Sequence, residues 1–275
     1  MTMSIDRYAV MGNPIKHSKS PQIHKAFADQ TDQRMTYTSM LVPEAEFEDS
    51  VRHFFADGGK GLNITVPFKL RAFELADELT ERAQRAKAVN TLWKSTDGRI
   101  VGDNTDGVGM VRDIMHNHDG RIAGKKILIV GAGGAVRGVL APVLAENPAL
   151  LVLTNRTFDK AFHLAEEFVD LGRIEALHMN QLKGPFDWII NGTAASLQGD
   201  VPELPESVLG EHTRVYDMMY GKEITPFNAW ALDNGAEKAF DGLGMLVEQA
   251  AESFRKWRGV MPSTPTVISD LRAAM

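Results

Sequence analysis

Hydrophobic residues along the chain alternate between short aliphatic runs and longer amphipathic segments, a pattern typical of strands followed by helices. The stretch from Lys125 to Arg156 shows this pattern most clearly. Its run from Ile127 to Val130 is continuously aliphatic, which is typical of a strand buried on both faces of a parallel sheet. A glycine turn follows, then apolar residues at helical spacing from Val136 to Leu144, and then a second aliphatic run before Asn155. The pattern predicts a strand–turn–helix–strand unit.

The same alternation extends over the rest of the chain. We expect further strands at residues 8–11, 36–42, 61–66, 186–191 and 215–220, and helices at residues 20–27, 47–57, 81–88, 108–115, 241–257 and 267–274. Pro67-Phe68 opens one more helix. Ser20 before Pro21 indicates a helix start with Ser20 as the N-cap and Pro21 as the first helical residue. Asp97-Gly98 indicates a hairpin turn. Strands that alternate with helices favour βαβ units, so the predicted fold class is α/β.

The glycine turn is a candidate phosphate site. Gly131, Gly133 and Gly134 lie between a strand and a helix N-terminus. Glycines let the backbone approach a pyrophosphate, and the free N–H groups at the positive end of the helix dipole hold its charge. A tight turn without a ligand is the alternative. The third position of the dinucleotide fingerprint is Val136 instead of glycine, which predicts a slightly wider spacing between helix and strand.

The end of the second strand indicates which dinucleotide binds. A site for NAD needs an acid about 20 residues after the first glycine, to accept from the ribose 2′-OH. The chain has Asn155, Arg156 and Thr157 at this place, with Lys160 shortly after. No carboxylate repels a 2′-phosphate here, and two cations can bind one. The sequence therefore favours NADP.

Composition and charge narrow the function further. At 275 residues the chain is one large or two modest domains, and its net charge of −6 argues against a nucleic-acid groove or an anionic membrane surface. It has no cysteine, which excludes disulfides and thiolate chemistry and is compatible with a reducing cytoplasm. No apolar run reaches the ~18 residues of a membrane span, and the start MTMSIDRY lacks a signal sequence. The eight histidines show no ligand spacing, so we expect no metal site.

Several polar residues near predicted helix starts are candidates for chemistry. Ser18 and Ser20 lie beside a helix N-terminus, where they form either a cradle for a carboxylate or a simple cap. Lys69 falls in the first helical turn after NITVPF, where a lysine faces the positive end of the dipole; the alternative is a solvated surface cation. Asp106 precedes an apolar helix and is either an N-cap or a functional acid.

Several separate motifs together resemble the NADP-dependent biosynthetic shikimate 5-dehydrogenases of the shikimate/quinate dehydrogenase family. They are GNPIKHSKSP (12–21), NITVPFK (63–69), AVNT (88–91), DNTDG (103–107), GAGGA (131–135), NRT (155–157) and DGLGMLVEQA (241–250). The resemblance implies an α/β enzyme of two domains with a cleft between them. Residues 1–106 plus 243–275 would form the substrate domain, and residues 107–242 a Rossmann-type, doubly wound cofactor domain.

The resemblance also implies roles for individual residues. Ser18 and Ser20 would bind the substrate carboxylate, and Lys69 and Asp106 would flank the reacting carbon. The ring hydroxyls would be held by Asn63, Thr65, Asn90, Asp106, Tyr220 and Gln249. NADP would contact Glu81, Gly131, Ala132, Gly133, Gly134, Ala135, Asn155, Arg156, Thr157, Lys160, Met218 and Gly242. The expected substrates are shikimate and 3-dehydroshikimate.

The chemistry of the residues agrees with these roles and leaves some alternatives open. Reduction of a ketone needs a proton for the developing alkoxide, and a cation such as Lys69 can stabilise the charge and donate that proton. Asp106 is the alternative proton carrier. Quinate with NAD or NADP is the alternative substrate, and a non-catalytic dinucleotide sensor the alternative class. The loops 191–196 and 221–224 depart from the family pattern near the nicotinamide end. The oligomeric state, a homodimer included, stays open.

Overall fold

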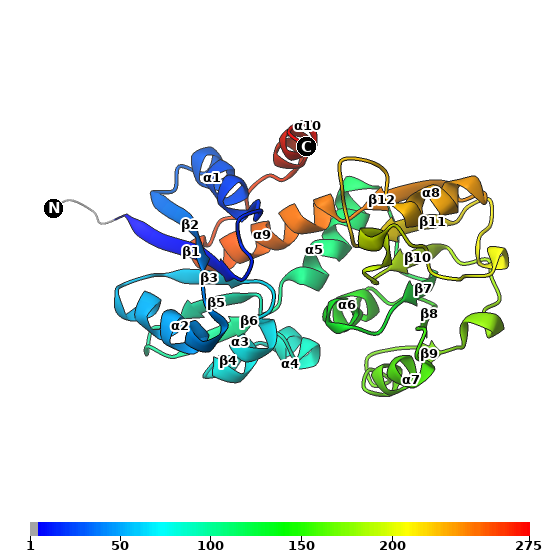
Figure 1. Ribbon diagram of the computed structural model, residues 1–275, viewed down its shortest axis with the longest axis horizontal. Coiled ribbons are helices and arrows are strands. Elements are labelled where there is room, and N and C mark those ends of the chain that lie inside the picture. Colours follow the sequence, from blue (N-terminus) through cyan, green and yellow to red (C-terminus); the bar gives the residue numbers. More distant parts are fainter. Residues whose placement is uncertain (1–4) are drawn as a thin grey trace. The chain divides into compact units, whose positions relative to one another are not determined.

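A computed structural model describes residues 5–275 of the chain (Figure 1). Residues 1–4, which begin the N-terminal stretch considered above, lie outside the described part. The chain divides into two compact units. Unit 1 holds the described residues up to Gly109 and Val247–Ser269, and unit 2 holds Met110–Leu246 and Asp270–Met275. These boundaries fall inside helices α5 (Asp106–Arg112), α9 (Leu243–Arg258) and α10 (Pro265–Ala273).

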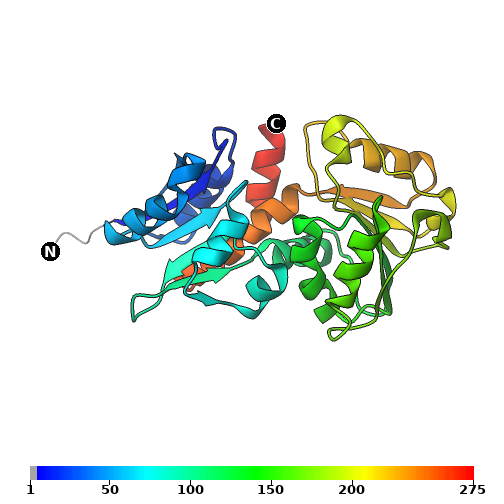
Figure 2. The same cartoon turned by 60° about the horizontal axis from the view of Figure 1, so that its bottom comes forward.

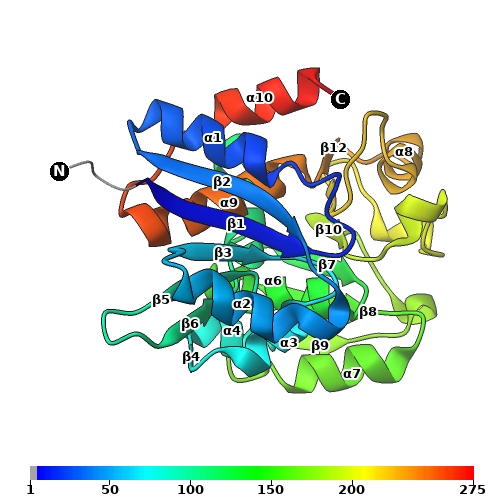
Figure 3. The ribbon, with the colours of Figure 1, turned by 60° about the vertical axis from the view of Figure 1, so that its left-hand side comes forward.

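Unit 1 contains a mixed sheet of six strands in the order β2-β1-β3-β5-β6-β4. The strands are β1 (Asp6–Gly12), β2 (Met35–Leu41), β3 (Gly61–Ile64), β4 (Glu78–Leu79), β5 (Thr91–Lys94) and β6 (Ile100–Asp103). Strand β1 pairs in parallel with β2 and β3, which lie on either side of it in Figure 3. Strand β5 pairs antiparallel with β3 and β6. The β5–β6 hairpin (Figure 2) turns at Asp97-Gly98, where Gly98 has a φ of +88°, so the predicted hairpin is confirmed.

Helices cover both faces of this sheet. They are α1 (Ser20–Gln30), α2 (Phe47–Ala56), α3 (Lys69–Leu75), α4 (Glu81–Ala86) and the part of α9 from Val247 onward. Successive residues of a strand point to opposite faces. On β1, Ala9 and Met11 accordingly pack in the core formed with Phe47 of α2, whereas Tyr8 packs against Trp257 of α9, with ring centroids 4.9 Å apart.

Unit 2 contains a sheet of six parallel strands in the order β12-β11-β10-β7-β8-β9. The strands are β7 (Lys126–Val130), β8 (Leu150–Thr154), β9 (Ile174–Ala176), β10 (Trp188–Asn191), β11 (Arg214–Asp217) and β12 (Lys238–Asp241). The chain builds outward from β7 in one direction and then returns to add β10 beside it in the other. This is the doubly wound Rossmann order, whose ligands bind where the strand order reverses, at the carboxyl ends of β7 and β10.

The predicted burial of the first unit-2 strand on both faces is confirmed. Ile127 and Ile129 belong to one core cluster, and Leu128 and Val130 belong to another on the opposite face. Unit 2 also contains helices α6 (Gly134–Ala145), α7 (Phe158–Glu166) and α8 (Pro226–Asp233), and a π-helical turn (Asp113–Asn117) that follows α5.

Some predicted elements differ from the structure. Strands β4, β9 and β12 were not predicted: β4 and β9 are only two and three residues long, and β12 reads KAFD, without an aliphatic run. The predicted strand over 215–220 ends at Asp217, so Met218 and Tyr220 lie in the loop after it. The prediction of Ser20 as N-cap is wrong: Lys19 is the N-cap and Ser20 is the first helical residue. Within residues 5–275, no helix is both long and apolar enough to span a membrane.

Candidate functional site

Lys69 and Asp106 form an ion pair in unit 1. The Nζ atom of Lys69 lies 2.6 Å from Oδ2 of Asp106, and the two side chains are 35% and 17% exposed. Lys69 is the first residue of α3, where the helix dipole disfavours a cation, and Asp106 is the first residue of α5, where the dipole favours an anion. The carboxylate compensates the poor placement of the lysine. The pair thus keeps an ammonium group partly accessible beside a fixed carboxylate.

Asn90 holds the other oxygen of that carboxylate. Its Nδ2 lies 2.8 Å from Oδ1 of Asp106 and contacts Thr105 Oγ1 at 2.9 Å and Gln249 Oε1 at 3.3 Å. Its Oδ1 accepts from the backbone N–H of Thr105 at 2.9 Å. Both oxygens of Asp106 are therefore oriented, one by Lys69 and one by Asn90. The structure brings together four of the predicted residues, which come from distant parts of the sequence.

Asn63 lies in the wall behind this group, with its amide engaged internally. Its Oδ1 accepts from Tyr37 Oη at 2.7 Å and lies 3.2 Å from Nε2 of His24. Its Nδ2 donates to the Asn90 carbonyl at 3.1 Å and to Ser253 Oγ at 3.1 Å. A side-chain amide can accept two hydrogen bonds through its oxygen and donate two through its nitrogen, and these contacts occupy all four. Asn63 is 6% exposed, and its predicted contact with a ring hydroxyl stays a prediction.

His24 is fully buried beside Asn63 and stacks on Tyr37, with ring centroids 4.2 Å apart. Burial lowers its pKa from 6.5 to about 3, although the hydrogen bond with Asn63 acts in the opposite direction. The ring is therefore neutral at pH 7, with its proton on Nε2 facing the Asn63 oxygen. Burial also raises the pKa of Tyr37 well above its usual value, against the effect of its hydrogen bond with Ser20.

The predicted carboxylate cradle lies at the start of α1. Ser18 Oγ accepts from the backbone N–H of Ser20 at 3.3 Å, which makes a small turn stabilised by a hydroxyl. Ser18 is half-buried and Ser20 is buried. Thr65 is half-buried at the end of β3, where its backbone N–H donates to the Met11 carbonyl at 3.0 Å.

The glycine loop of unit 2 has the geometry of a phosphate cradle. Gly131 has a φ of +114°, which favours glycine, and its N–H donates to the Thr154 carbonyl at 2.8 Å. A Cβ atom added to Gly133 or Gly134 would meet nothing within 4 Å, so this face of the loop is open. Helix α6 begins at Gly134, so its free N–H groups and positive dipole end lie at the opening. The loop fits a dinucleotide pyrophosphate. Ala132 and Ala135 complete it.

The helix beside this loop does not need a third glycine at Val136. The Val136 side chain is fully buried, and a Cβ at Gly192 would lie 2.3 Å from its Cγ2 atom. Gly192, just after β10, therefore leaves the room that the valine takes. This accounts for one departure of loop 191–196 from the family pattern. Thr193 and Ser196 hold the loop in place, since Thr193 Oγ1 donates to Asn191 Oδ1 at 2.8 Å and Ser196 Oγ to Asp217 Oδ2 at 2.6 Å.

A cavity of about 600 Å³ lies at the carboxyl ends of these strands. It is lined by Val130, Asn155, Arg156, Met179, Thr193, Ala194, Ala195, Gln198, Asp200, Val201, Pro202 and Glu203. Asn155 and Arg156 were predicted, whereas Met179 and the loop 198–203 were missed because nothing local marks them. Thr157 is the N-cap of α7, and Lys160 is exposed on that helix; neither lines the cavity.

Other predicted residues are distributed over both units. Gly242 is packed so closely that an added Cβ would lie 2.2 Å from the Met218 carbonyl oxygen, which explains the glycine. Tyr220 is half-buried in unit 2, and this burial raises its pKa. Glu81 belongs to unit 1, as the exposed first residue of α4, whereas the other predicted cofactor residues belong to unit 2.

Comparisons with known proteins agree with one another. Family models match residues 10–92 as a shikimate dehydrogenase substrate binding domain, 113–199 as shikimate/quinate 5-dehydrogenase, and 242–271 as the shikimate 5′-dehydrogenase C-terminal domain. A shikimate dehydrogenase (NADP(+)) of Alkalilimnicola ehrlichii is 57% identical over 97% of this chain and 98% of its own.

Solved structures are similar over the same extent. An Ael1 enzyme from Pseudomonas putida is 49% identical, with a TM-score of 0.93 over 97% of this chain and 98% of its own. The shikimate 5-dehydrogenase of Thermus thermophilus, in complex with NADP(H) and shikimate, is 30% identical, with a TM-score of 0.85 over 98% of this chain and 100% of its own.

Proposed function

The chain belongs to the shikimate dehydrogenase family, and on this premise we propose that it is an NADP-dependent shikimate dehydrogenase. It reversibly reduces 3-dehydroshikimate to shikimate, on the route to chorismate and the aromatic amino acids. The observation that carries the proposal is the Lys69–Asp106 ion pair, whose carboxylate accepts a hydrogen bond from Asn90. Lys69 and Asn90 lie in the segment that matches the substrate binding domain, and Asp106 lies shortly after that segment. The glycine loop of unit 2 supports the coenzyme.

Lys69 and Asp106 assist the transfer of a proton. NADPH, when bound, supplies the hydride that reduces the carbonyl carbon. The oxygen of that carbonyl then develops negative charge. The ammonium of Lys69 stabilises this charge and donates a proton to the oxygen. Asp106 Oδ2 lies 2.6 Å from Lys69 Nζ and orients the N–H groups of the lysine. Asn90 in turn orients Asp106 through its other carboxylate oxygen. Asp106, at 2.6 Å from Lys69, is the alternative proton carrier.

We assign substrate binding to residues of unit 1 and coenzyme binding to residues of unit 2. The roles of Tyr220 toward the substrate and of Glu81 toward the coenzyme stay predictions. Ser18 and Ser20 receive the carboxylate, and Thr65, Asn90, Asp106 and Gln249 receive ring hydroxyls. Asn63, whose amide donates to the Asn90 carbonyl and to Ser253 Oγ, is assigned a ring hydroxyl as well. Gly131 to Ala135 hold the pyrophosphate, and Met218 and Gly242 contact another part of the coenzyme. Asn155, Arg156, Thr157 and Lys160 hold the 2′-phosphate.

A cytoplasmic location fits an enzyme without cysteines that draws on NADPH. Fractionation of cells that express the chain from its own promoter tests this location. A homodimer stays a prediction that light scattering tests.

The direct test of the function is an absorbance assay of coenzyme reduction with four combinations of substrate and coenzyme. The proposal predicts that shikimate with NADP⁺ gives the highest kcat/KM, above shikimate with NAD⁺ and above quinate with either coenzyme. A preference for quinate would move the chain to the other branch of the family. Binding of NADP⁺ without turnover of either acid would make the chain a dinucleotide sensor.

A further inference from the structure

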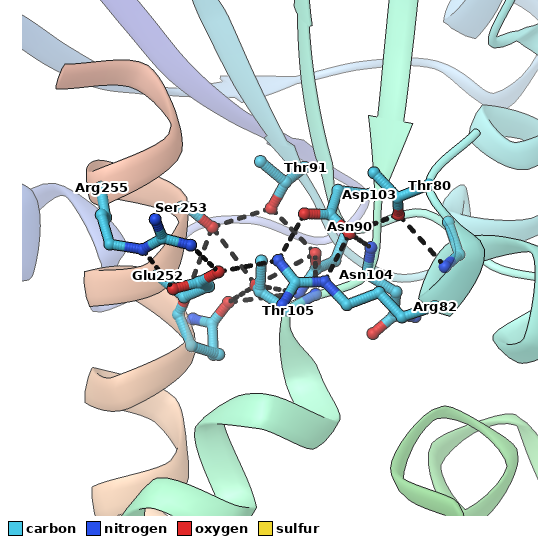
Figure 4. A network of polar contacts seen from close by, with 12 residues as sticks. Thr80, Arg82, Asn90, Thr91, Asp103, Asn104, Thr105, Glu252, Ser253 and Arg255 are labelled. Carbon is cyan, nitrogen blue, oxygen red and sulfur yellow. Dashed lines mark hydrogen bonds and ion pairs between the residues drawn. The ribbon is translucent and has the colours of Figure 1, made fainter. Parts of the chain in front are cut away.

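A second group of charged residues lies in unit 1, where residues of α4, β6 and α9 meet (Figure 4). Its centre is Asp103, a fully buried carboxylate at the end of β6. Arg82 of α4 binds it through both oxygens, with Nε 2.6 Å from Oδ1 and Nη2 2.5 Å from Oδ2. Thr80 Oγ1 donates to the same Oδ1 at 2.6 Å. These hydrogen bonds outweigh the burial that would raise the pKa of Asp103, so that its pKa is lowered and the carboxylate stays charged.

The same guanidinium also binds α9. Nη2 of Arg82 lies 2.9 Å from Oε1 of Glu252, which is 2% exposed. Arg255 binds Glu252 from the other side, with Nε 2.9 Å from Oε2 and Nη2 2.7 Å from Oε1. Two guanidinium groups therefore balance two buried carboxylates. Arg82 is the member that joins the end of β6 to α9.

Both partners of Arg82 lead to the candidate catalytic pair. On one side, Asp103 Oδ1 accepts from the backbone N–H of Asn104 at 2.8 Å, and Asn104 Oδ1 accepts from the backbone N–H of Asp106 at 3.1 Å. The Asp103 carbonyl also accepts from the backbone N–H of Asn90 at 3.0 Å. The loop that aims Asp106 is therefore fixed from Asp103 onward.

On the other side, Glu252 lies on α9 three residues after Gln249 and next to Ser253. Gln249 Oε1 lies 3.3 Å from Nδ2 of Asn90, and Ser253 Oγ accepts from Asn63 at 3.1 Å. The position of α9 thus sets the position of two groups that bind Asn90 and Asn63. Arg82 holds this helix and the Asp106 loop to each other.

Stability alone does not account for this arrangement. Replacement of a buried ion pair by well-packed apolar side chains is often neutral or stabilising, because the charges lose their hydration. What an apolar core cannot supply is a bidentate contact that fixes two segments in one relative position. A site that needs its reacting groups in place to a fraction of an ångström gains from such a contact.

We propose that Arg82 is a positioning residue for the reaction: through Asp103 and Glu252 it fixes the Asp106 carboxylate against Lys69. The inference rests on the proposed function. Arg82 contacts neither Lys69 nor Asp106 within the described residues, so it acts through the loop and through α9. Loss of the bidentate contact therefore lowers kcat while coenzyme binding is kept.

The test uses two variants and one control. Arg82→Lys keeps the charge but cannot bind both oxygens of Asp103, and Arg82→Met with Asp103→Asn removes the pair without leaving an unpaired buried carboxylate. The matched control is Arg258→Met. Arg258 lies on α9, is 16% exposed against 21% for Arg82, and binds Asp6, Tyr8 and Gln33 without touching the Asp106 loop. Melting temperatures are measured for all three, and kinetics are measured below the lowest of them.

We expect kcat with shikimate to fall about 100-fold in Arg82→Met with Asp103→Asn and about 10-fold in Arg82→Lys. The Kd of NADP⁺ should stay within about twofold, and Arg258→Met should keep kcat within about twofold despite a lower melting temperature. Parent-like kcat in Arg82→Lys, or an equal loss in Arg258→Met, would overturn the inference. If the doubly substituted protein does not fold, Arg82→Lys decides alone.

A double-mutant cycle separates positioning from a general structural role. Arg82→Lys is combined with Asp106→Asn. If Arg82 acts through Asp106, adding Arg82→Lys to the Asp106→Asn variant lowers kcat by less than about twofold. Full additivity of the two effects would contradict the inference. A parent protein that turns over no shikimate would contradict the proposed function itself, which keeps the two failures distinguishable.

Discussion

Glu252 should give the protein an acid-sensitive share of its stability. Burial would raise the pKa of this carboxyl, but hydrogen bonds from Arg255 and Arg82 outweigh burial and lower the pKa from 4.5 to about 2. A carboxyl with a lowered pKa in the folded state stabilises that state above its unfolded pKa and loses this contribution as the pH falls through the folded value. The window therefore runs from pH 4.5 down to about pH 2. This lowering of the pKa of Glu252 from 4.5 to about 2 corresponds to about 3 kcal/mol, of which about 2 kcal/mol is lost by about pH 3.

Urea unfolding between about pH 6 and about pH 3 measures this contribution in the parent and in Glu252→Gln. Intrinsic fluorescence follows the unfolding of both units, because Trp93 and Trp257 lie in unit 1 and Trp188 and Trp230 lie in unit 2. We expect the free energies of unfolding of the two proteins to converge by about 2 kcal/mol as the pH falls below about 4.5. Glu237→Gln is the control, because Glu237 lies 3.6 Å from Arg214 and is 33% exposed, so that its pair contributes less than about 1 kcal/mol. A constant difference between parent and Glu252→Gln over the whole range would refute the reasoning.

Three further predictions concern other parts of the molecule. Replacement of His24 by Gln should flatten the loss of stability between pH 6.5 and about 3, because the buried ring has a folded pKa of about 3 and the unfolded chain takes up the proton first; an unchanged slope in urea unfolding would contradict this. Ser18→Ala with Ser20→Ala should weaken shikimate binding by about 3–6 kcal/mol in calorimetric titration, if two hydrogen bonds to a carboxylate add, with NADP⁺ binding unchanged. A lower melting temperature with unaltered shikimate affinity would instead assign these serines to the helix start. Arg156→Ala should lower kcat/KM for NADP⁺ about 10- to 150-fold and affect the value for NAD⁺ much less, and the preference should shrink with added salt. Equal losses for both coenzymes would assign Arg156 to adenine stacking or to structure.

Much of the fold could be predicted because burial leaves a local trace. The run from Ile127 to Val130 alternates between two core clusters, and such a strand must be apolar at every position. Strands β4 and β9 leave no such trace. Glu78–Leu79 is too short for a period to appear, and Ile174–Ala176 carries Glu175 at the edge of its sheet. These two strands form because β6 and β8 offer backbone hydrogen-bonding partners, which the sequences of β4 and β9 do not reveal.

The candidate site was predictable where its residues lie in short motifs. Lys69 and Asp106 each stand at a helix start that the sequence marks, and the structure brings them to 2.6 Å. The role of a neighbour is harder to predict. Asn63 belongs to the same motif as Lys69, yet its amide is used up by Tyr37, His24 and Ser253, whose approach no local pattern indicates.

The contact between Arg82 and Glu252 shows the same limit more strongly. The two residues are 170 positions apart and meet only because α9 returns to unit 1. Taken alone, each reads as an ordinary charge on an amphipathic helix. Which charges meet is decided by tertiary packing, and the periodicity of one segment contains no information about it.

The kcat of Lys69→Ala with saturating shikimate and NADP⁺ tests most directly whether Lys69 provides the proton to the developing alkoxide. We expect a kcat lower by roughly 10²–10⁴, with little change in the KM for shikimate, because the lost group acts on charge that develops only during the reaction. Asp106 should stay in place in this variant, since Asn90 still binds its Oδ1 at 2.8 Å. A kcat within a few-fold of the parent would contradict the claim and assign proton transfer to another group.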